Sequence, residues 1–496
     1  MVLMPRIAIV GGGLTGLATA FWLQRRAAHL DVVVLEARER AGGNVGTDEV
    51  HGYRVERGPN GFLDRTPALP RLVQALGLSD QLVPASRGSR RFRFLCVHGR
   101  LYRLPHGPLG LLATPLLSWR GKRDLLAELW RRPRRPSAAE ADESVYDFVA
   151  RRAGREAADL FADALVTGIQ GGDPRRLSMA ACFPRIVALE QQYGSIIRGL
   201  IRHARERKRQ ARRAGQPPPS PPQLWSFREG LQRLIDALVQ ALGGSLRLGV
   251  AVTALQPATD TAPGNGPAPR WLLHSTTSPP LAADAVVLAC PAYAQAELLA
   301  PLDPPLAAEI AAIPYNRIAV VALGYRQVDC PQVPDGFGYI APQSQRRDVL
   351  GVQWCSAIFP ERAPAGMVLW RALCGGVQRG DILDWDDHTL LRAVQQELAQ
   401  VLRVQAPPAF VRIIRYPRAI PQYEIGHLAR LQRIDAAGQR WPHLFLSGNA
   451  YRGIALNDCA EEAERLAAEF LRRFPPPASP APAMPADARP SGATPP

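Results

Sequence analysis

Residues 6–16 read Arg-Ile-Ala-Ile-Val-Gly-Gly-Gly-Leu-Thr-Gly, an apolar run that leads into the pattern G-x-G-x-x-G. The apolar stretch 17–23 that follows is typical of a helix. A strand, a tight glycine turn and a helix in this order present free N–H groups and the positive end of the helix dipole to a phosphate. The residues expected to hold a dinucleotide here are Gly11, Gly12, Gly13, Leu14, Thr15 and Gly16.

A second apolar run, residues 32–35, ends in Glu36. In a dinucleotide-binding fold, an acid at this distance beyond the glycines can accept hydrogen bonds from ribose hydroxyls. The glycine pattern alone could be an ordinary turn. Strand, glycines, helix, strand and acid in register predict a dinucleotide site.

Length and composition limit the class of protein. The chain has 496 residues, 47% of them hydrophobic and 21% charged, which predicts two or three globular domains. It contains no uncharged apolar run of about 18 residues that would cross a membrane. It reaches its first strand without a basic and apolar leader, so we expect no signal peptide and a cytoplasmic location. The seven cysteines are scattered without a C-x-x-C pair, so we expect reduced thiols and no metal site.

The formal charge of +16 at pH 7 suggests an anionic partner, such as a membrane surface, nucleic acid or an acidic substrate. The arginines are not interleaved with aromatic residues on a recognisable module, so we expect no nucleic-acid partner. The basic and proline-rich tract 202–222 has two interpretations: a solvated helix end with a linker, or an anion-binding surface.

Two further segments fit a flavin nucleotide. After residues 53–56, which alternate like a strand, comes Gly58-Pro59-Asn60-Gly61, which is typical of a loop and taken alone could be an ordinary turn. The resemblance to FAD enzymes described below implies that this loop lies beneath a flavin ring. Near the C-terminus, residues 444–449 predict a strand with a glycine exit that leads into a helix over 459–473. A second helix N-terminus of this kind would stabilise the anionic reduced flavin. Between these segments, alternation over residues 90–97 predicts another strand.

Several motifs resemble known flavoenzymes. The spacing E-x-x-x-R-x-G-G, from Glu36 to Gly43, is the pattern of FAD enzymes similar to amine oxidases. Gly168-Ile169-x-x-Gly172-Asp173, Ile420-Pro421-Gln422-Tyr423 and the run 448–459 resemble the protoporphyrinogen oxidase family, and the resemblance covers about residues 5–474. That family oxidises a porphyrinogen in haem biosynthesis, usually with oxygen as acceptor.

The resemblance implies roles for individual residues. Arg93 matches an arginine that pairs with a substrate propionate, and Gly168 matches a glycine whose carbonyl accepts from pyrrole N–H groups. Thr167 departs from the arginine of some members, which puts a second propionate contact in doubt. Apolar residues expected to sandwich the macrocycle are Phe337, Ile340 and Leu373. Besides the glycine turn and Glu36, residues expected to hold FAD are Gly43, Asn44, Gly58, Pro59, Asn60, Gly61, Val252, Ile454, Ala455 and Leu456. The chemistry requires no dedicated protein acid or base, so no catalytic side chain is named.

The expected fold class is α/β, with a Rossmann-like FAD-binding domain, a mixed-sheet substrate domain and a helical subdomain. The FAD-binding domain would comprise residues 1–88, 223–296 and 438–474, and the substrate-binding domain residues 89–104 and 297–437. Residues 105–222 would form the helical subdomain, either lying on a membrane or packed on itself. Residues 475–496, rich in proline and alanine, would be a disordered tail.

The function expected from the resemblance is FAD-dependent oxidation of protoporphyrinogen IX to protoporphyrin IX. Oxidation of coproporphyrinogen III on the same scaffold is a close alternative, and a flavin-binding scaffold without turnover stays open. An amine oxidase or desaturase is less favoured, because amine oxidases use a lysine near flavin N5 and neither Lys122 nor Lys208 lies in a flavin-facing segment. The expected partners are the porphyrinogen, oxygen, the inner face of the cell membrane and the next enzyme of haem synthesis.

Overall fold

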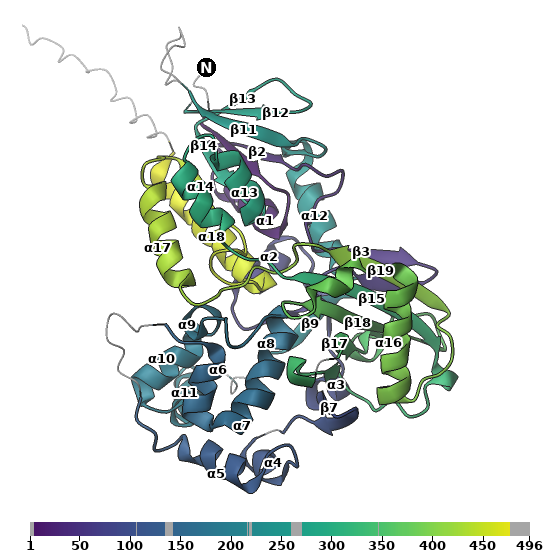
Figure 1. The fold of residues 1–496 in the computed structure, drawn as a ribbon. Coiled ribbons are helices and arrows are strands. Elements are labelled where there is room, and N and C mark those ends of the chain that lie inside the picture. The colour runs from purple at the N-terminus through teal and green to yellow at the C-terminus, as the bar shows by residue number, and fades with distance from the viewer. Residues whose placement is uncertain are drawn as a thin grey trace, which may run out of the picture.

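The protein is seen here in a computed structural model that describes residues 4–105, 107–133, 142–215, 217, 221–258, 270–345 and 347–476. Figure 1 shows three bodies: a sheet flanked by helices at the top, a larger sheet at the right and a group of helices at the lower left. The tail that the sequence predicts to be disordered lies outside the described residues from position 477 onward.

A parallel sheet of five strands, in the order β10-β2-β1-β14-β20, carries the glycine motif. Its strands come from distant parts of the chain: β1 (Arg6–Val10), β2 (Asp31–Leu35), β10 (Leu246–Arg247), β14 (Ala285–Leu288) and β20 (Leu444–Leu446). Every pairing in it is parallel. The predicted α/β class with a Rossmann-like sheet is therefore confirmed.

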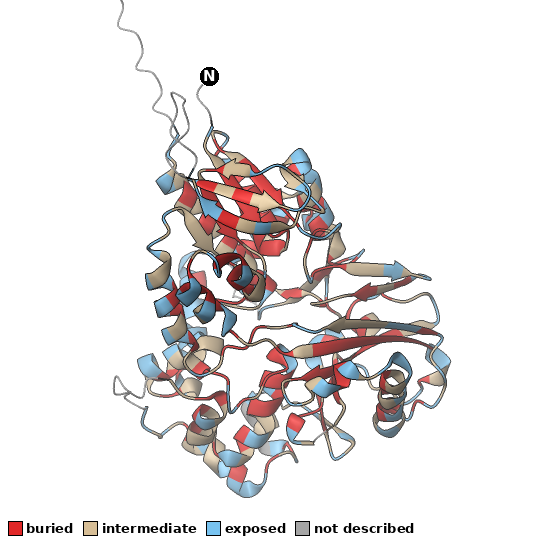
Figure 2. Cartoon of the chain, turned by 45° about the horizontal axis from the view of Figure 1, so that its top comes forward, coloured by how far each residue is buried: buried red, intermediate tan, exposed pale blue. Residues whose placement is uncertain are grey.

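Both faces of this sheet are covered, which explains why β1 and β2 are apolar after their first residues, Arg6 and Asp31. Ile7 and Ile9 pack on one side against α1 (Leu14–Arg26), α12 (Gln232–Leu242) and α18 (Leu456–Arg473). Ala8 and Val10 face the opposite core. That core is closed by α13 (Ala292–Leu299), α14 (Pro304–Ala311), α17 (His427–Gly438) and the antiparallel strands β11 (Val252–Pro257), β12 (Trp271–Ser275) and β13 (Leu281–Ala283). Figure 2 shows the buried residues concentrated in this sheet and in the long strands of the second one.

The second sheet has seven strands in the order β19-β15-β18-β17-β16-β7-β8. Its strands are β7 (Phe94–Val97), β8 (Arg100–Arg103), β15 (Arg317–Arg326), β16 (Gly338–Ile340), β17 (Val349–Gln353), β18 (Met367–Gly376) and β19 (Phe410–Tyr416). Only the β16–β7 pairing is parallel among those described, so the sheet is mixed. Helix α16 (Asp387–Leu402) packs on one face.

The strand predicted over residues 90–97 is wrong in its first half. Residues 87–91 form a short helix, α3 (Arg87–Arg91), and the strand begins only at Phe94. The Ser86 hydroxyl oxygen accepts a hydrogen bond from the Ser89 N–H at 3.1 Å and so caps this helix. Alternation of arginine with aromatic residues over positions 91–94 crosses the end of this helix, which is why the pattern alone does not show the break.

Short elements link the two sheets. They are β3 (Thr47–Val50), β4 (Tyr53–Glu56), β5 (Phe62–Leu63), α2 (Ala68–Ala75), β6 (Leu82–Pro84), β9 (Leu224–Phe227) and α15 (Cys355–Ile358). The loop from β4 to β5 contains Gly58-Pro59-Asn60-Gly61, and the Gly58 carbonyl oxygen accepts a hydrogen bond from Arg371 of β18.

The third body consists of helices. They are α4 (Gly107–Ala113), α5 (Trp119–Ala127), α6 (Val145–Ala153), α7 (Arg155–Ala157), a π-helix (Ala158–Ala162), α8 (Asp163–Gln170), α9 (Met179–Cys182), α10 (Pro184–Tyr193) and α11 (Ile196–Arg213). Arg152 and Glu128 form a buried ion pair that ties α6 to the end of α5. The Glu128 carboxylate also accepts from the Ser195 hydroxyl at 2.7 Å, so the start of α11 is held at the same point. No described helix is long and apolar enough to cross a membrane.

Candidate active site

The glycine turn leaves room for a ligand at the start of α1. Gly13 caps this helix without a side-chain hydrogen bond, and the first turn carries no acidic residue. A Cβ added at Gly13 would meet no atom within 4 Å, whereas one at Gly16 would lie 2.0 Å from the Gly11 carbonyl oxygen. Gly16 therefore allows the helix to pack on the turn, and Gly13 faces open space in front of free N–H groups. This arrangement fits a pyrophosphate.

Glu36 is buried at the end of β2 and anchored to the same turn. Its carboxylate accepts from the Gly12 N–H at 2.6 Å and from the Arg38 N–H at 3.0 Å. The Glu36 carbonyl oxygen accepts from the Val250 N–H at 2.9 Å, which brings the start of β11, with Val252, to this edge of the sheet. Glu36 thus lies beside the glycine turn, and the start of β11 is joined to Glu36.

Two further loops pack here: the one at residues 42–44 packs on the glycine turn, and the one at Gly58 packs on residues 42–44. The Gly42 N–H donates to the Gly12 carbonyl oxygen at 2.7 Å, and a Cβ at Gly43 would lie 3.4 Å from Gly13 Cα. A Cβ at Gly58 would lie 2.3 Å from the Asn44 carbonyl oxygen, so only glycine allows this loop so close. The predicted cofactor residues Gly43, Asn44 and Gly58 are therefore neighbours.

Asn60 supplies a test of whether a ligand fits here. Its side chain is only 7% exposed, yet neither its amide nitrogen nor its amide oxygen has a hydrogen-bond partner among the described residues. A buried amide costs free energy when it is unpaired. The donor and acceptor edge of a flavin would satisfy both atoms, so the residues present fit the cofactor.

The start of α18 lies against the start of α1, although the two are more than 400 residues apart. Thr15 hydrogen-bonds the side chain of Cys459, and burial raises the pKa of that thiol to about 11. The Asn457 side-chain amide donates to the Leu63 carbonyl oxygen, which joins α18 to β5, the strand that follows Gly61. The predicted residues Ile454, Ala455 and Leu456 lead into α18 at this point. Two helix N-termini from opposite ends of the chain therefore converge on one region.

The predicted macrocycle residues come from two bodies that touch. A Cβ on Gly168 of α8 would lie 2.5 Å from Ile340 Cδ1 of β16. Ile340 and Leu373 both pair with Gly351, so they lie in one row across three strands and point to the same face of the sheet. This face is opposite the one that α16 covers. Leu165, one turn before Gly168, is 38% exposed although it is apolar, and the sequence reasoning missed it.

Arg93 lies at the edge of this apolar region. Its guanidinium carbon is 4.9 Å from the centre of the Phe337 ring. Its side chain is exposed, and it forms no ion pair with any described residue. Partial desolvation, with the nearby charge of Arg65, lowers its pKa. A guanidinium without a carboxylate of its own is suited to bind one from a ligand.

Thr167 is occupied by other contacts. Its hydroxyl donates to Asp163 at 3.1 Å and accepts from the Gln343 amide at 3.1 Å. It is buried, so it offers no second site for a carboxylate. Thr167 therefore does not supply the second propionate contact that an arginine supplies in some family members.

With the geometry described, comparison with known proteins identifies the family. The model of flavin-containing amine oxidoreductases matches residues 14–471. The chain belongs to this family. A flavin held by a dinucleotide-binding fold is FAD, so the chain is an FAD-dependent oxidoreductase.

Within this family the chain resembles protoporphyrinogen oxidases. It is 34% identical to the chloroplastic protoporphyrinogen oxidase of Oryza sativa subsp. japonica, over 93% of this chain and 87% of that one. It is 33% identical to the protoporphyrinogen oxidase of Homo sapiens, over 94% and 98%. A coproporphyrinogen III oxidase of Bacillus subtilis is 26% identical over 94% and 97%. The crystal structure of a candidate protoporphyrinogen oxidase from Exiguobacterium sp. 255-15 matches with a TM-score of 0.79 and 26% identity, over 95% of this chain and all of that one.

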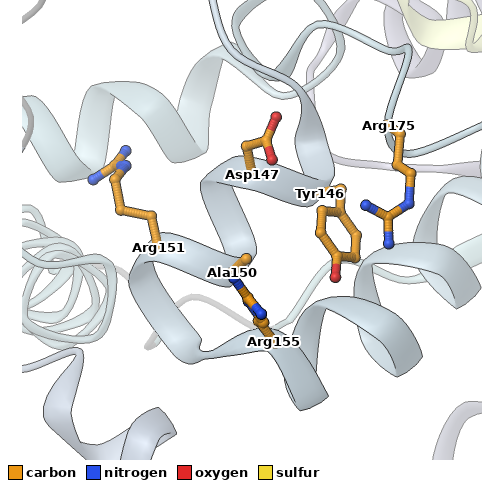
Figure 3. Close-up of a pocket in the computed structure, with 6 residues that line it drawn as sticks. All are labelled: Tyr146, Asp147, Ala150, Arg151, Arg155 and Arg175. Atoms are coloured by element: carbon orange, nitrogen blue, oxygen red, sulfur yellow. The ribbon is translucent and has the colours of Figure 1, made fainter.

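A separate pocket lies on the helical body. Figure 3 shows its lining residues on α6, α7 and the loop after α8. It has a volume of about 610 Å³ and is lined by Tyr146, Asp147, Ala150, Arg151, Arg155 and Arg175. The Arg175 guanidinium stacks on the Tyr146 ring at 3.5 Å, and the Tyr146 hydroxyl donates to Asp159 at 2.8 Å. None of the predicted cofactor or substrate residues lines it. Among the described residues, no cluster of His, Cys, Asp and Glu could hold a metal ion.

Proposed function

We propose that this oxidoreductase converts protoporphyrinogen IX to protoporphyrin IX, with oxygen as the final acceptor. The observation that carries the proposal is the unpaired Arg93 guanidinium over Phe337, next to the apolar row of Ile340 and Leu373. An apolar, planar molecule with carboxylate arms would fit such an arrangement. The curated relatives named protoporphyrinogen oxidase support the same substrate.

Bound FAD supplies a two-electron acceptor for hydrogen removed from a methylene bridge of the macrocycle. The protein's part is to orient the substrate. Arg93 would hold a propionate, and the Gly168 carbonyl would accept from a pyrrole N–H. Ile340, Leu373 and Phe337 would exclude water from the macrocycle. Three such two-electron steps, with tautomerisation of the macrocycle, convert the porphyrinogen to the porphyrin. In each step a proton leaves to solvent, and one oxygen molecule takes up the electron pair and two protons and leaves as hydrogen peroxide.

A second candidate substrate, coproporphyrinogen III, is favoured by a specific observation. Burial raises the pKa of Asp458, and the nearby charges of Arg185 and Arg65 oppose that shift. The charge of Arg65 also lowers the pKa of Arg93. Neither Arg65 nor Arg185 forms an ion pair with a described residue, and both side chains are exposed. Two unpaired arginines near Asp458 at the start of α18, one of them also near Arg93, would suit a substrate with more than two carboxylates.

A fluorescence assay under air with each porphyrinogen in turn tests the proposal. Formation of protoporphyrin at the higher kcat/KM supports the first candidate, and formation of coproporphyrin at the higher value supports the second. No porphyrin from either substrate, in protein that carries FAD, would overturn both. The same assay under nitrogen with a quinone would identify the acceptor.

We also propose that α5 attaches the protein to the inner face of the cell membrane. Trp119 and Trp130 are 82% and 72% exposed, and Leu126 between them is also exposed. Basic residues surround them, and the Lys122 ammonium lies 5.3 Å from the Trp119 ring. Exposed tryptophans next to cations fit an anionic lipid surface. Attachment there would bring the apolar product near the next enzyme of haem synthesis.

The division of the chain into domains follows from the same proposal. The FAD-binding unit would comprise residues 1–88, 223–296 and 438–474, and the substrate unit residues 89–104 and 297–437. The helical unit, residues 105–222, would carry both Gly168 and the membrane surface. The parallel sheet, the mixed sheet and the helical group support this division.

A further inference from the structure

Arg371 is a buried cation that the proposed function leaves unexplained. It lies on β18, on the face of the sheet opposite α16, and its side chain is 1% exposed. Its Nη2 donates to the Gly58 carbonyl oxygen at 2.6 Å. Its Nε and Nη1 are also buried and have no hydrogen-bond partner in the part of the chain that the structure describes. Two N–H-bearing nitrogens of one buried guanidinium are therefore unpaired.

The acid that could neutralise Arg371 already has other partners. Glu56 is buried, and its carboxylate accepts from Arg362 at 3.2 Å, from the Thr47 hydroxyl at 2.8 Å and from the Leu231 N–H at 3.0 Å. Arg371 forms no ion pair with Glu56 or with any other described residue. Two buried guanidinium groups thus share one carboxylate, and an isolated buried charge is costly. The region carries a positive charge that calls for an anion from outside the chain.

The unpaired polar groups around Arg371 lie near the loop that contains Gly58 and Asn60. Gln353 lies directly opposite Arg371 on β17, and its buried amide oxygen is also unpaired. Asn60, two residues beyond the carbonyl that Arg371 holds, has both amide atoms unpaired. Leu373 of the substrate row is two residues along the same face of β18. Arg371 therefore lies between the cofactor loop and the apolar row.

We propose that Arg371 is the positioning cation that stabilises the negative charge of FAD when it is reduced. A hydride carries two electrons and one proton, so its transfer from the substrate to FAD adds one negative charge to the cofactor. A buried cation in a region of low dielectric would favour that charge strongly. The unpaired N–H groups are already in place before reduction, so the protein need not rearrange. The proposal rests on the proposed function only in that FAD is bound, and not on the identity of the substrate.

The test compares the FAD-loaded wild type with Arg371→Met and Arg371→Lys. The readouts are the two-electron reduction potential, from anaerobic titration against a reference dye, and the affinity for sulfite, which adds to the flavin and leaves a negative charge on it. We expect Arg371→Met to shift the potential to more negative values and to bind sulfite about tenfold more weakly or worse. A tenfold change corresponds to about 30 mV for a two-electron couple. Arg371→Lys should recover part of both.

Arg347→Met is the matched control. Arg347 lies beside the same sheet and pairs with Glu397 on the α16 side. Its replacement should leave the potential and the sulfite affinity unchanged. If Arg371→Met holds FAD with an unchanged potential, Arg371 serves only to hold the Gly58 loop and the proposal is overturned.

A measurement on the wild type covers the case in which neither variant retains FAD. The absorbance of the reduced, bound flavin distinguishes its anionic from its neutral form. We expect the anionic form down to pH values below that at which free reduced flavin takes up its proton. A neutral reduced flavin at pH 7 would overturn the proposal. None of these readouts uses a porphyrinogen, so inactivity toward both porphyrinogens would not affect the result.

Discussion

Gly168 of α8 and Ile340 of β16 meet so closely that a Cβ on the glycine would lie 2.5 Å from Ile340 Cδ1. The contact joins the helical body to the mixed sheet at the apolar row. Gly168→Ala would force Ile340 to move toward that row, and overpacking of this kind costs about 1–3 kcal/mol. We expect the KM for the porphyrinogen to rise by about tenfold while FAD content stays unchanged, as steady-state kinetics and flavin absorbance would show.

Gly438→Ala is the control for this substitution. Gly438 ends α17, has no positive φ, and a Cβ there would meet no atom within 4 Å. Its replacement should change neither KM nor FAD content. Unaltered kinetics in Gly168→Ala as well would mean that the substrate does not approach the contact.

Arg93→Ala removes the guanidinium proposed to hold a propionate. A hydrogen bond to a charged group contributes about 1.5–3 kcal/mol, so we expect the KM to rise by about tenfold to a hundredfold. FAD content should stay the same, and Arg93→Lys should recover part of the loss. Arg103→Ala, on the adjacent strand, removes an arginine that stacks on Phe92 and should have no such effect. Equal KM values for Arg93→Ala and wild type would exclude the propionate role.

Local spacing explains what could be predicted from the sequence. The β1–α1 turn and the strand–glycine–helix order that leads into α18 follow from glycine positions and apolar runs that lie within a few residues of each other. The helix start predicted at residue 459 is three residues late, because α18 begins at Leu456. The burial of Arg371 could not be predicted, because an arginine that alternates with apolar residues along a strand is expected on the exposed face. Its burial depends on the loop at Gly58, 313 residues away in the chain. The roles of Arg93, Gly168, Phe337, Ile340 and Leu373 stay predictions, although the structure brings Gly168 onto Ile340 and Arg93 onto Phe337.

Membrane attachment can be tested through the two exposed tryptophans of the α5 region. Burying a large apolar side chain in lipid contributes about 1.5–3 kcal/mol, so the double variant Trp119→Ser/Trp130→Ser should bind vesicles at least about tenfold more weakly. Co-sedimentation with vesicles rich in anionic lipid, at low and high salt, measures this. Val328→Ser, which changes a residue 78% exposed beside β15, should bind as the wild type does. Wild-type protein that stays in the supernatant with these vesicles would refute the attachment.

We expect the loop before α18 to lose stability in acid because of the buried His427. The imidazole is 1% exposed, stacks on Tyr423 with ring centres 4.3 Å apart, and its Nε2 lies 3.1 Å from the Tyr451 carbonyl oxygen. Burial lowers the pKa of His427, and the hydrogen bond to Tyr451 opposes that shift only in part. The folded protein therefore holds a neutral imidazole at pH values where an unfolded chain, with a His pKa of about 6.5, takes up a proton.

The sign of the pH dependence follows from this difference. The contribution of His427 to stability is fully present above about pH 6.5 and is lost as the pH falls toward the lower pKa of the folded state, by at most about 1.4 kcal/mol per pH unit. Urea unfolding of the FAD-loaded protein at pH 7.5 and pH 5.5 measures the loss. His427→Gln cannot take up this proton, so its free energy of unfolding should fall less over the same range, whereas exposed His388→Gln on α16 should follow the wild type. Since His427 holds the Tyr451 carbonyl between β20 and α18, FAD should also be released faster at pH 5.5 from the wild type, in step with the loss of stability. Identical pH slopes in His427→Gln and wild type would show that another group controls the acid sensitivity.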